Sequence, residues 1–241
     1  MKRAVVLLSG GLDSATTLYI AKRDGFKCFC LIFDYGQRHR REIESARRIA
    51  RFAHCAHKVI KFNLPWKGSS LLDRNINIPG VTKSLSRSLV LARDSLRSQV
   101  TGEIPSTYVP ARNIIFLSFA LSYAEAISAS AIYIGAHAQD YSGYPDCRPE
   151  FFKAFAKVIS RGTKSGFEKK KVEIKTPLLN KNKAQIIRLG RSLGVPFALT
   201  WSCYQGGKRP CSKCDSCYFR AKGFKEAGIE DPLIKNEPRP S

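Results

Sequence analysis

Short apolar runs alternate with longer amphipathic stretches along the first sixty residues. The runs are rich in β-branched and aliphatic side chains, which is typical of buried strands, and they cover residues 3–8, 26–33 and 57–62. Between them, 14–24 has the pattern of a helix ended by Gly25, and 40–53 has one apolar and one charged face. Strands that alternate with helices predict an α/β fold with a doubly wound parallel sheet and right-handed crossovers.

Residues 63–106 interrupt this alternation. The segment contains several prolines and glycines and a basic stretch from Lys83 to Arg97. A connection of this length is uncommon in a compact domain unless it has a function. We expect a short helix at about 85–98 and a mobile cover over the active site.

Regular periodicity returns after this segment and predicts the rest of the fold. The expected helices are 113–128, 149–161, 181–193 and a last one at about 218–227, with strands at 131–135 and, weakly, 171–175. The helix 113–128 is apolar nearly all round, so we expect it to be buried. We divide the chain into an α/β domain, 1–195, and a C-terminal segment, 196–241.

A glycine pair follows the first predicted strand, in the sequence Ser9-Gly10-Gly11-Leu12-Asp13-Ser14. Paired glycines let backbone N–H groups approach an anion, and the following helix adds the partial positive charge of its N-terminus. A doubly wound sheet binds phosphates at this place. Asp13 would hold Mg²⁺ or orient the loop. The alternative interpretation is an ordinary turn in which Ser14 is the helix N-cap.

Four of the eight cysteines lie close together near the C-terminus: Cys203, Cys211, Cys214 and Cys217. Their spacing suits a structural Zn²⁺ site with four thiolate ligands and no open position. An iron–sulfur cluster also takes four cysteines, although its usual spacings differ, and coincidental buried thiols are the remaining alternative. Cys28 and Cys30 fit core packing, Cys55 has no visible partner, and Cys147 lies in a polar loop where a reactive role is conceivable.

The chain is strongly basic, with 41 Lys and Arg against 19 Asp and Glu and a formal charge of +22. This excess either covers solvated helix faces or attracts nucleic acid, and a small-molecule activity does not require it. No apolar stretch is long enough to span a membrane, and the run Ala4 to Leu8 is too short for a signal peptide. We expect a cytoplasmic protein.

Three further polar strings follow predicted strands or precede the apolar helix. They are Asp34-Tyr35-Gly36-Gln37-Arg38-His39, Val109-Pro110-Ala111-Arg112-Asn113 and the stretch from Ala136 to Arg148, which contains Ser142-Gly143-Tyr144-Pro145-Asp146-Cys147-Arg148. Each alone is ordinary turn chemistry. Together they are expected at the same carboxyl edge of the sheet as the glycine pair.

Ser9 to Ser14 resembles the SGGxDS signature of the PP-loop, or N-type, ATP pyrophosphatases, which have a Rossmann-like fold. With the three polar strings, the four cysteines and Thr200-Trp201-Ser202-Cys203-Tyr204, the chain resembles the 7-cyano-7-deazaguanine synthases (QueC) of the queuosine pathway. This resemblance covers about residues 2–228. It implies that a carbon–nitrogen ligase uses ATP and ammonia to convert 7-carboxy-7-deazaguanine, through an amide, into the nitrile.

The resemblance also assigns residues to roles, with ATP, Mg²⁺ and structural Zn²⁺ as cofactors and a homodimer as the expected assembly. The ATP-binding residues are Leu8, Ser9, Gly10, Gly11, Leu12, Asp13, Ser14, Ala15 and Thr16. The catalytic candidates are Asp13, Ser14, Arg112 and Arg148. The substrate-binding candidates are Tyr35, Gln37, Arg38, Asp140, Tyr144 and Asp146. Asp140 is the favoured carboxylate for the guanine-like edge of the base, and Asp146 would then be a helix-capping or Mg²⁺ contact.

Two other functions remain open at this stage. The +22 charge favours a PP-loop enzyme that acts directly on tRNA, of the thiolation or lysidine type, although the two specific strings at 34–39 and 142–148 oppose it. The second is a non-catalytic zinc protein that kept the fold and binds nucleic acid or has a regulatory role. Independently of these alternatives, the +22 charge predicts weak, non-specific contact with nucleic acid.

Overall fold

The computed structural model describes residues 1–66, 68–73, 75–78, 104–137 and 144–234. Its centre is a sheet of five parallel strands in the order β3-β2-β1-β4-β5. The strands are β1 (Arg3–Leu7), β2 (Lys27–Asp34), β3 (Ala56–Lys61), β4 (Ala131–Tyr133) and β5 (Glu173–Lys175). Val5 of β1 is in register with Phe29 on one side and Ile132 on the other. The strand order reverses at β1, which makes the gap between β1 and β4 the topological switch point.

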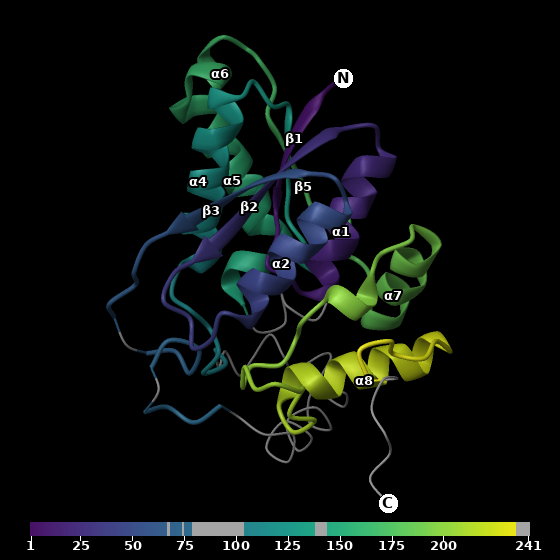
Figure 1. Ribbon diagram of the computed structural model, residues 1–241. Helices are drawn as coiled ribbons and strands as arrows, with labels where there is room; N and C mark the ends of the chain where they lie inside the picture. Colours follow the sequence, from purple (N-terminus) through teal and green to yellow (C-terminus); the bar gives the residue numbers. More distant parts are fainter. Residues whose placement is uncertain (67, 74, 79–103, 138–143, 235–241) are drawn as a thin grey trace, which may run out of the picture.

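Helices cover both faces of this sheet (Figure 1). The α-helices are α1 (Leu12–Arg23), α2 (Arg41–Phe52), α4 (Arg112–Ala126), α5 (Pro149–Gly162), α6 (Lys164–Phe167), α7 (Lys183–Ser192) and α8 (Asp215–Ala227), with short 3-10 turns η1 (Pro145–Cys147) and η2 (Phe197–Leu199). One core lies beneath α1, α2 and α7, and the other lies beneath α4 and α5. The predicted doubly wound α/β fold is therefore confirmed.

Most predicted elements agree with the structure within a few residues. The interpretation of Ser14 as an N-cap is wrong, because α1 already begins at Leu12 and Gly11 is its cap. Similarly, α8 begins at Asp215 rather than Tyr218, so that Cys214 is its N-cap. The short α6 was not predicted, although Thr163 caps it by accepting a hydrogen bond from the Gly166 N–H at 3.0 Å. The helix expected at 85–98 lies outside the described residues.

Helix α4 differs from expectation in its burial. Its apolar composition predicted a helix buried all round, but only one side, which includes Leu117 and Ala120, is buried against the sheet. On the other side Ile114 is 44% exposed and Phe119 is 39% exposed. The reason is that α4 belongs to the outer helical layer, so the described part of the chain covers only its inner face.

The segment after Pro196 packs against the α/β domain. Arg220 of α8 is buried and donates to Asp231 at 2.6 and 2.8 Å and to the Thr200 hydroxyl at 2.7 Å. Phe224 meets Phe197 edge to face in the core beneath α7. A buried Arg–Asp pair with further hydrogen bonds holds the two ends of this segment together. Asp231, in a stretch for which the sequence indicated no role, is thus a structural anchor.

Cys55 has neighbours that the sequence did not reveal. It lies just before β3 and packs against the core that contains Cys28 and Cys30 of β2. Hydrogen bonds from these two thiols lower the pKa of Cys55 to about 3. The expectation of core packing agrees with the burial of Cys28 and Cys30. In the described residues, no helix is both long and apolar enough to cross a lipid bilayer.

Candidate active site and metal centre

The loop between β1 and α1 exposes several backbone donors at the carboxyl edge of the sheet. Ser14 orders it: its hydroxyl accepts from the Ser9 N–H at 3.2 Å and lies 3.1 Å from the Gly11 carbonyl. Among the bonds between described residues, the N–H groups of Gly10, Leu12, Asp13 and Ser14 have no acceptor. Orphan N–H groups at the start of a twelve-residue helix are suited to bind an anion.

The nine residues predicted to bind ATP do not all offer side chains to this loop. Leu8, Leu12, Ala15 and Thr16 are each at most 2% exposed and belong to the core. Thr16 donates its hydroxyl to the Leu12 carbonyl at 2.9 Å. Only backbone groups of these four residues could contact a nucleotide. Ser9 is exposed and Asp13 is partly exposed, so both have side chains available.

Asp13 already has a cationic partner. Lys183, at the start of α7, donates to both Asp13 carboxylate oxygens at 2.9 and 2.8 Å. The Lys183 ammonium also lies 2.9 Å from Nε2 of His137, which follows β4. Burial alone would raise the pKa of Asp13, but the charges of Lys183 and His137 hold it well below its usual range. An ionised carboxylate and an ammonium therefore sit together beside the open N–H groups.

The loop between β1 and α1 is also fixed from the side of α2 and Trp201. The Gly10 carbonyl accepts from the Ser45 hydroxyl of α2 and from the Trp201 N–H, both at 2.9 Å. Gly10 has a φ of +87°, and a Cβ there would lie 2.3 Å from the carbonyl oxygen of Glu42. The first turn of α2 thus touches the loop, and only glycine allows this approach.

A second ionisable group, Glu42, lies on that first turn of α2. Among the described residues its carboxylate takes part in no hydrogen bond or ion pair. Burial raises its pKa to about 7, although the charge of Arg112 opposes this and a Cys203 thiolate adds to it. Arg112 begins α4, and burial would lower its pKa, but Tyr35, Asp146 and Cys147 raise it overall.

A small pocket opens beside Glu42. Its volume accessible to a water molecule is about 20 Å³ and its whole empty space, open solvent included, is about 240 Å³, and its lining comprises Tyr35, Gln37, Arg38, His39, Glu42, Leu71 and Tyr204. Gln37 is used within its own turn, where its Oε1 accepts from the Tyr35 N–H at 2.9 Å. Arg38 donates through one terminal nitrogen to the Asp73 carbonyl at 2.6 Å, whereas its Nε is buried with no partner among the described residues.

The other predicted residues lie on or near the same edge but in different roles. Asp146 is buried and its Oδ2 accepts from the Asn113 N–H at 3.0 Å, so it caps the start of α4 from outside. The Tyr144 hydroxyl lies 2.6 Å from that of Thr107. Arg148 is exposed at the start of α5. Asp140 lies outside the described residues.

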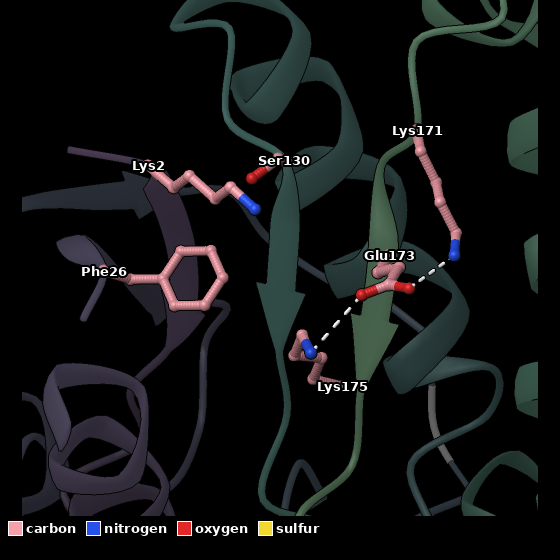
Figure 2. A pocket seen from close by; sticks show the side chains of 6 residues that line it. All are labelled: Lys2, Phe26, Ser130, Lys171, Glu173 and Lys175. Carbon is pink, nitrogen blue, oxygen red and sulfur yellow. Dashed lines mark ion pairs between the residues drawn. The ribbon is translucent and has the colours of Figure 1, made fainter. Parts of the chain in front are cut away.

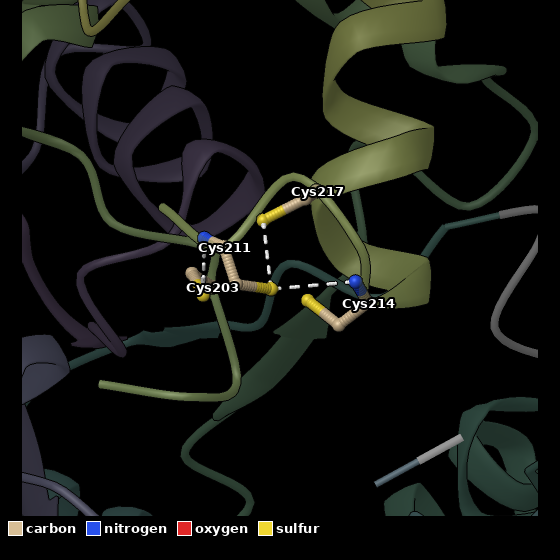
Figure 3. A group of neighbouring side chains, drawn as sticks. All are labelled: Cys203, Cys211, Cys214 and Cys217. Carbon is tan, nitrogen blue, oxygen red and sulfur yellow. Dashed lines mark hydrogen bonds between the residues drawn. The ribbon is translucent and has the colours of Figure 1, made fainter. Parts of the chain in front are cut away.

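The four C-terminal cysteines converge. Their sulfur atoms all lie within 4.8 Å of one another (Figure 3). Backbone N–H groups of Gln205 and Cys211 donate to the Cys203 sulfur at 3.4 and 3.2 Å. Hydrogen bonds from the Cys214 and Cys217 thiols, and then these N–H groups, lower the pKa of Cys203. Four converging sulfurs with one stabilised thiolate are consistent with a zinc site.

The metal centre adjoins the pocket. Tyr204, which lines the pocket, directly follows Cys203. Gly206, with a φ of +65°, packs so closely on His39 that a Cβ there would lie 2.3 Å from it. A metal bound by the cysteines would therefore fix one wall of the pocket.

Lys183 and Glu42 were not among the residues predicted for the site. For Lys183 the available signal was its place after Asn182, which forms a capping box with Gln185 and so puts Lys183 in the first turn of α7. Glu42 lies on a helix whose other charged residues are solvated, and its sequence spacing gave no sign of burial. Only the tertiary contact between its helix turn and the loop after β1 partly buries it.

A larger hollow of about 250 Å³ lies at the opposite end of the strands (Figure 2). It is lined by Lys2, Phe26, Ser130, Lys171, Glu173 and Lys175. Glu173 already pairs with Lys171 at 2.6 Å and Lys175 at 3.3 Å. None of the predicted site residues lines it, and ligands of doubly wound sheets bind at the carboxyl ends instead.

Residues 3–228 match the family described as "Queuosine biosynthesis protein QueC". The chain is 53% identical over 233 residues to a 7-cyano-7-deazaguanine synthase of a Nostoc species, covering 96% of both chains. It is 51% identical over 234 residues to the enzyme of that name from Acetivibrio thermocellus, covering 97% of both. The corresponding protein of Thermoplasma volcanium is 50% identical over 232 residues, with 96% of this chain and 90% of that one covered.

Solved structures are more distant. An NMN synthetase from Francisella tularensis has a TM-score of 0.47 at 14% identity, with 100% of this chain and 79% of that one covered. A U34-tRNA thiolase from Methanococcus maripaludis has a TM-score of 0.45 at 17% identity, with coverages of 98% and 68%. Scores at this level are too low to assign a function.

Proposed function

The chain belongs to the QueC family, and from this premise we propose that it converts 7-carboxy-7-deazaguanine and ammonia into 7-cyano-7-deazaguanine with ATP, through an amide. The observation that carries the proposal is the family match over residues 3–228. It is supported by the open N–H groups that follow β1, because this chemistry needs a phosphate site next to a substrate pocket.

ATP would bind with its phosphates on the N–H groups between Ser9 and Ser14, at the start of α1. Lys183 would offset phosphate charge from the α7 side, since its ammonium already contacts Asp13 next to the loop. Asp13 and the phosphates offer the oxygen ligands that Mg²⁺ prefers, and the ion, when bound, would offset phosphate charge. Asp13 would then share its negative charge between Lys183 and the ion.

The reaction needs two activations. A carboxylate oxygen of the substrate attacks a phosphorus atom of ATP and expels either pyrophosphate or ADP. Ammonia adds to the activated carbon, the phosphorylated oxygen leaves as AMP or phosphate, and a proton is lost to give the amide. The amide oxygen is activated by ATP in the same way. Its departure, with loss of the remaining nitrogen protons, gives the nitrile.

Buried and exposed arginines would contribute differently to these steps. Arg112 is held next to Tyr35 and is the fixed cation of the site, suited to the substrate carboxylate or to the developing phosphate charge. Arg38 is tied to the backbone of the 73–76 turn and lines the pocket. Arg148 is exposed and would act only if substrate draws it in. His137, whose Nε2 lies 2.9 Å from the Lys183 ammonium, and His39, which lines the pocket, are the two histidines that could carry protons in these steps.

Zinc would be structural. Four thiolates complete a tetrahedron and leave no position for substrate. Cys203, Cys211, Cys214 and Cys217 would hold the ion, which ties the start of α8 to the pocket wall at Tyr204. We accordingly retain residues 1–195 as the ATP-binding unit and 196–241 as the zinc-binding segment.

Two kinds of macromolecular contact are also proposed. The uncovered face of α4, with Ile114 and Phe119, supports a homodimer, because exposed apolar side chains that cluster on one face often mark an interface. The exposed face of α2 carries Arg47, Arg48 and Arg51, which supports weak, sequence-independent contact with nucleic acid in a cytoplasmic setting.

The test is product analysis by mass spectrometry. Carboxylic acid labelled with heavy oxygen, heavy-nitrogen ammonium and MgATP are mixed with the protein. We expect the amide and then the nitrile, with heavy nitrogen in both and one heavy oxygen released into AMP or phosphate at each step. The labelled nucleotide product decides which of the two is released.

Absence of both labelled products, with intact zinc and a folded protein, would contradict the proposal. Filter binding of tRNA over a salt series tests the alternative of a tRNA-modifying enzyme. A tRNA thiolation or lysidine activity without nitrile formation would replace the proposed function.

A further inference from the structure

Glu42 is a partly buried acid for which the steps above have no use. It lies on the first turn of α2, whose backbone touches the phosphate loop at Gly10. Its carboxylate lines the pocket next to this loop and, among the described residues, takes part in no hydrogen bond or ion pair. A carboxylate that is partly buried in a pocket without a donor for its oxygens is available to bind a ligand.

The same pocket contains an unused donor. Arg38 lines it, and the Arg38 Nε is buried with no partner among the described residues. Its terminal nitrogen is occupied by the Asp73 and Ile76 carbonyls, which fixes the guanidinium in place. The pocket lining therefore contains one carboxylate with two acceptor oxygens and one fixed guanidinium with an unpaired N–H.

This pair selects among ligands. The Watson–Crick edge of a guanine-like base carries a carbonyl oxygen followed by two adjacent N–H donors. A carboxylate can accept from both donors, and an arginine N–H can donate to the carbonyl. An adenine edge has one donor beside a ring-nitrogen acceptor, which would face the carboxylate unfavourably. Ammonium has only donors and would meet Arg38 and Arg112 as like charges.

The volume of the pocket that is accessible to a water molecule is about 20 Å³, which is room for about one water, and its whole empty space, open solvent included, is about 240 Å³. A planar base is too large for the accessible volume alone, so only one edge of it would contact the pocket lining. We infer that Glu42 is the residue that recognises the guanine-like edge of the substrate, with Arg38 on its carbonyl group. The inference rests on the proposed function and names the residue that selects its substrate.

The experiment compares two ligands by titration calorimetry. One is 7-carboxy-7-deazaguanine, and the other is the same acid without the 2-amino group. The parent protein is expected to bind the amino compound roughly 10- to 100-fold more tightly, because the second donor is otherwise missing. In Glu42→Gln this preference should fall to near unity, since an amide cannot accept from both donors. Glu42→Asp keeps a carboxylate and should retain part of the preference.

Glu44→Gln is the matched control, since Glu44 is exposed on the same helix, and it should behave as the parent does. A ratio of affinities is unaffected by a general loss of folded protein. If the parent binds the acid and makes nitrile, yet Glu42→Gln keeps the full preference, Glu42 does not recognise the base. A Glu42→Gln variant that changes only the ammonium dependence would equally overturn the inference. A parent that neither binds nor converts the acid contradicts the proposed function instead.

Discussion

Two carboxylates at the same edge of the sheet are held in opposite ways. Asp13 is paired with Lys183 at 2.8 Å and approached by His137, and its pKa is lowered. Glu42 lies on the helix turn whose backbone contacts Gly10. Among the described residues its carboxylate has no such partner, and burial raises its pKa to about 7. The protein thus supplies the counter-charge for one acid and leaves the other to a ligand. This difference assigns Asp13 to the phosphates and Glu42 to the base.

The largest expected effect on stability comes from removing a metal ligand beside the pocket that Glu42 lines. Cys214→Ser removes one of the four metal ligands and should lower zinc content and thermal stability together. The loss is on the order of 5 kcal/mol, a part of the roughly 10–16 kcal/mol that a structural zinc supplies. Metal analysis and calorimetric melting measure both, and Cys55→Ser is the control that should keep its zinc. An unchanged melting point with full zinc would remove the metal assignment.

Gly10→Ala acts on the contact between the loop that follows β1 and the backbone of the first turn of α2. The new methyl would lie 2.3 Å from the Glu42 carbonyl oxygen at a φ of +87°. We expect a loss of about 4 kcal/mol from strain and overlap together. Gly25→Ala separates the two causes, because Gly25 has a φ of +81° and no atom within 4 Å of the added Cβ. Equal losses for both variants in denaturant unfolding would mean that the close approach at Gly10 is not significant.

Lys183→Met leaves Asp13 without its cation. The parent should be more stable by about 3 kcal/mol at neutral pH, as for other partly buried pairs that lose one member. Because the pKa of Asp13 is lowered by folding, its contribution is complete above its ordinary value of 3.8 and is lost as the pH falls further. The difference between parent and variant should therefore shrink in acid. Lys181→Met, two residues away, should show no such pH dependence in unfolding experiments.

Glu42→Gln has a predicted effect on stability no larger than that of Lys183→Met, and it should stabilise the protein, whereas the other variants destabilise it. Folded Glu42 keeps its proton up to about pH 7, whereas its ordinary pKa is 4.5. Between these values the folded state binds more protons, so the parent loses stability as the pH rises through this window. The variant cannot ionise and should be more stable by about 3 kcal/mol near pH 8 but nearly equal near pH 4. A variant less stable than the parent at both would show that the carboxylate is satisfied within the fold.

The sequence was sufficient for the regions whose structure is local. The strand, glycine pair and helix at residues 3–23 follow from short-range rules, as does the spacing of the four cysteines. It was insufficient wherever a role depends on contacts from distant elements. Lys183 reaches Asp13 across 170 positions, and Asp146 caps α4 across 33. The exposure of Phe119 depends on which layer α4 occupies, which its apolar composition does not encode.

The claim that the two carboxylates bind different ligands is tested most directly by titrating both ligands into a variant of each residue. A non-hydrolysable MgATP analogue and 7-carboxy-7-deazaguanine are each titrated into Asp13→Asn and Glu42→Gln by calorimetry. Asp13→Asn should bind the nucleotide at least about tenfold more weakly and keep its affinity for the acid. Glu42→Gln should lose affinity for the acid and bind the nucleotide as the parent does. If one variant loses both ligands, or if Glu42→Gln loses the nucleotide instead, the two acids do not serve separate sites and the account is wrong.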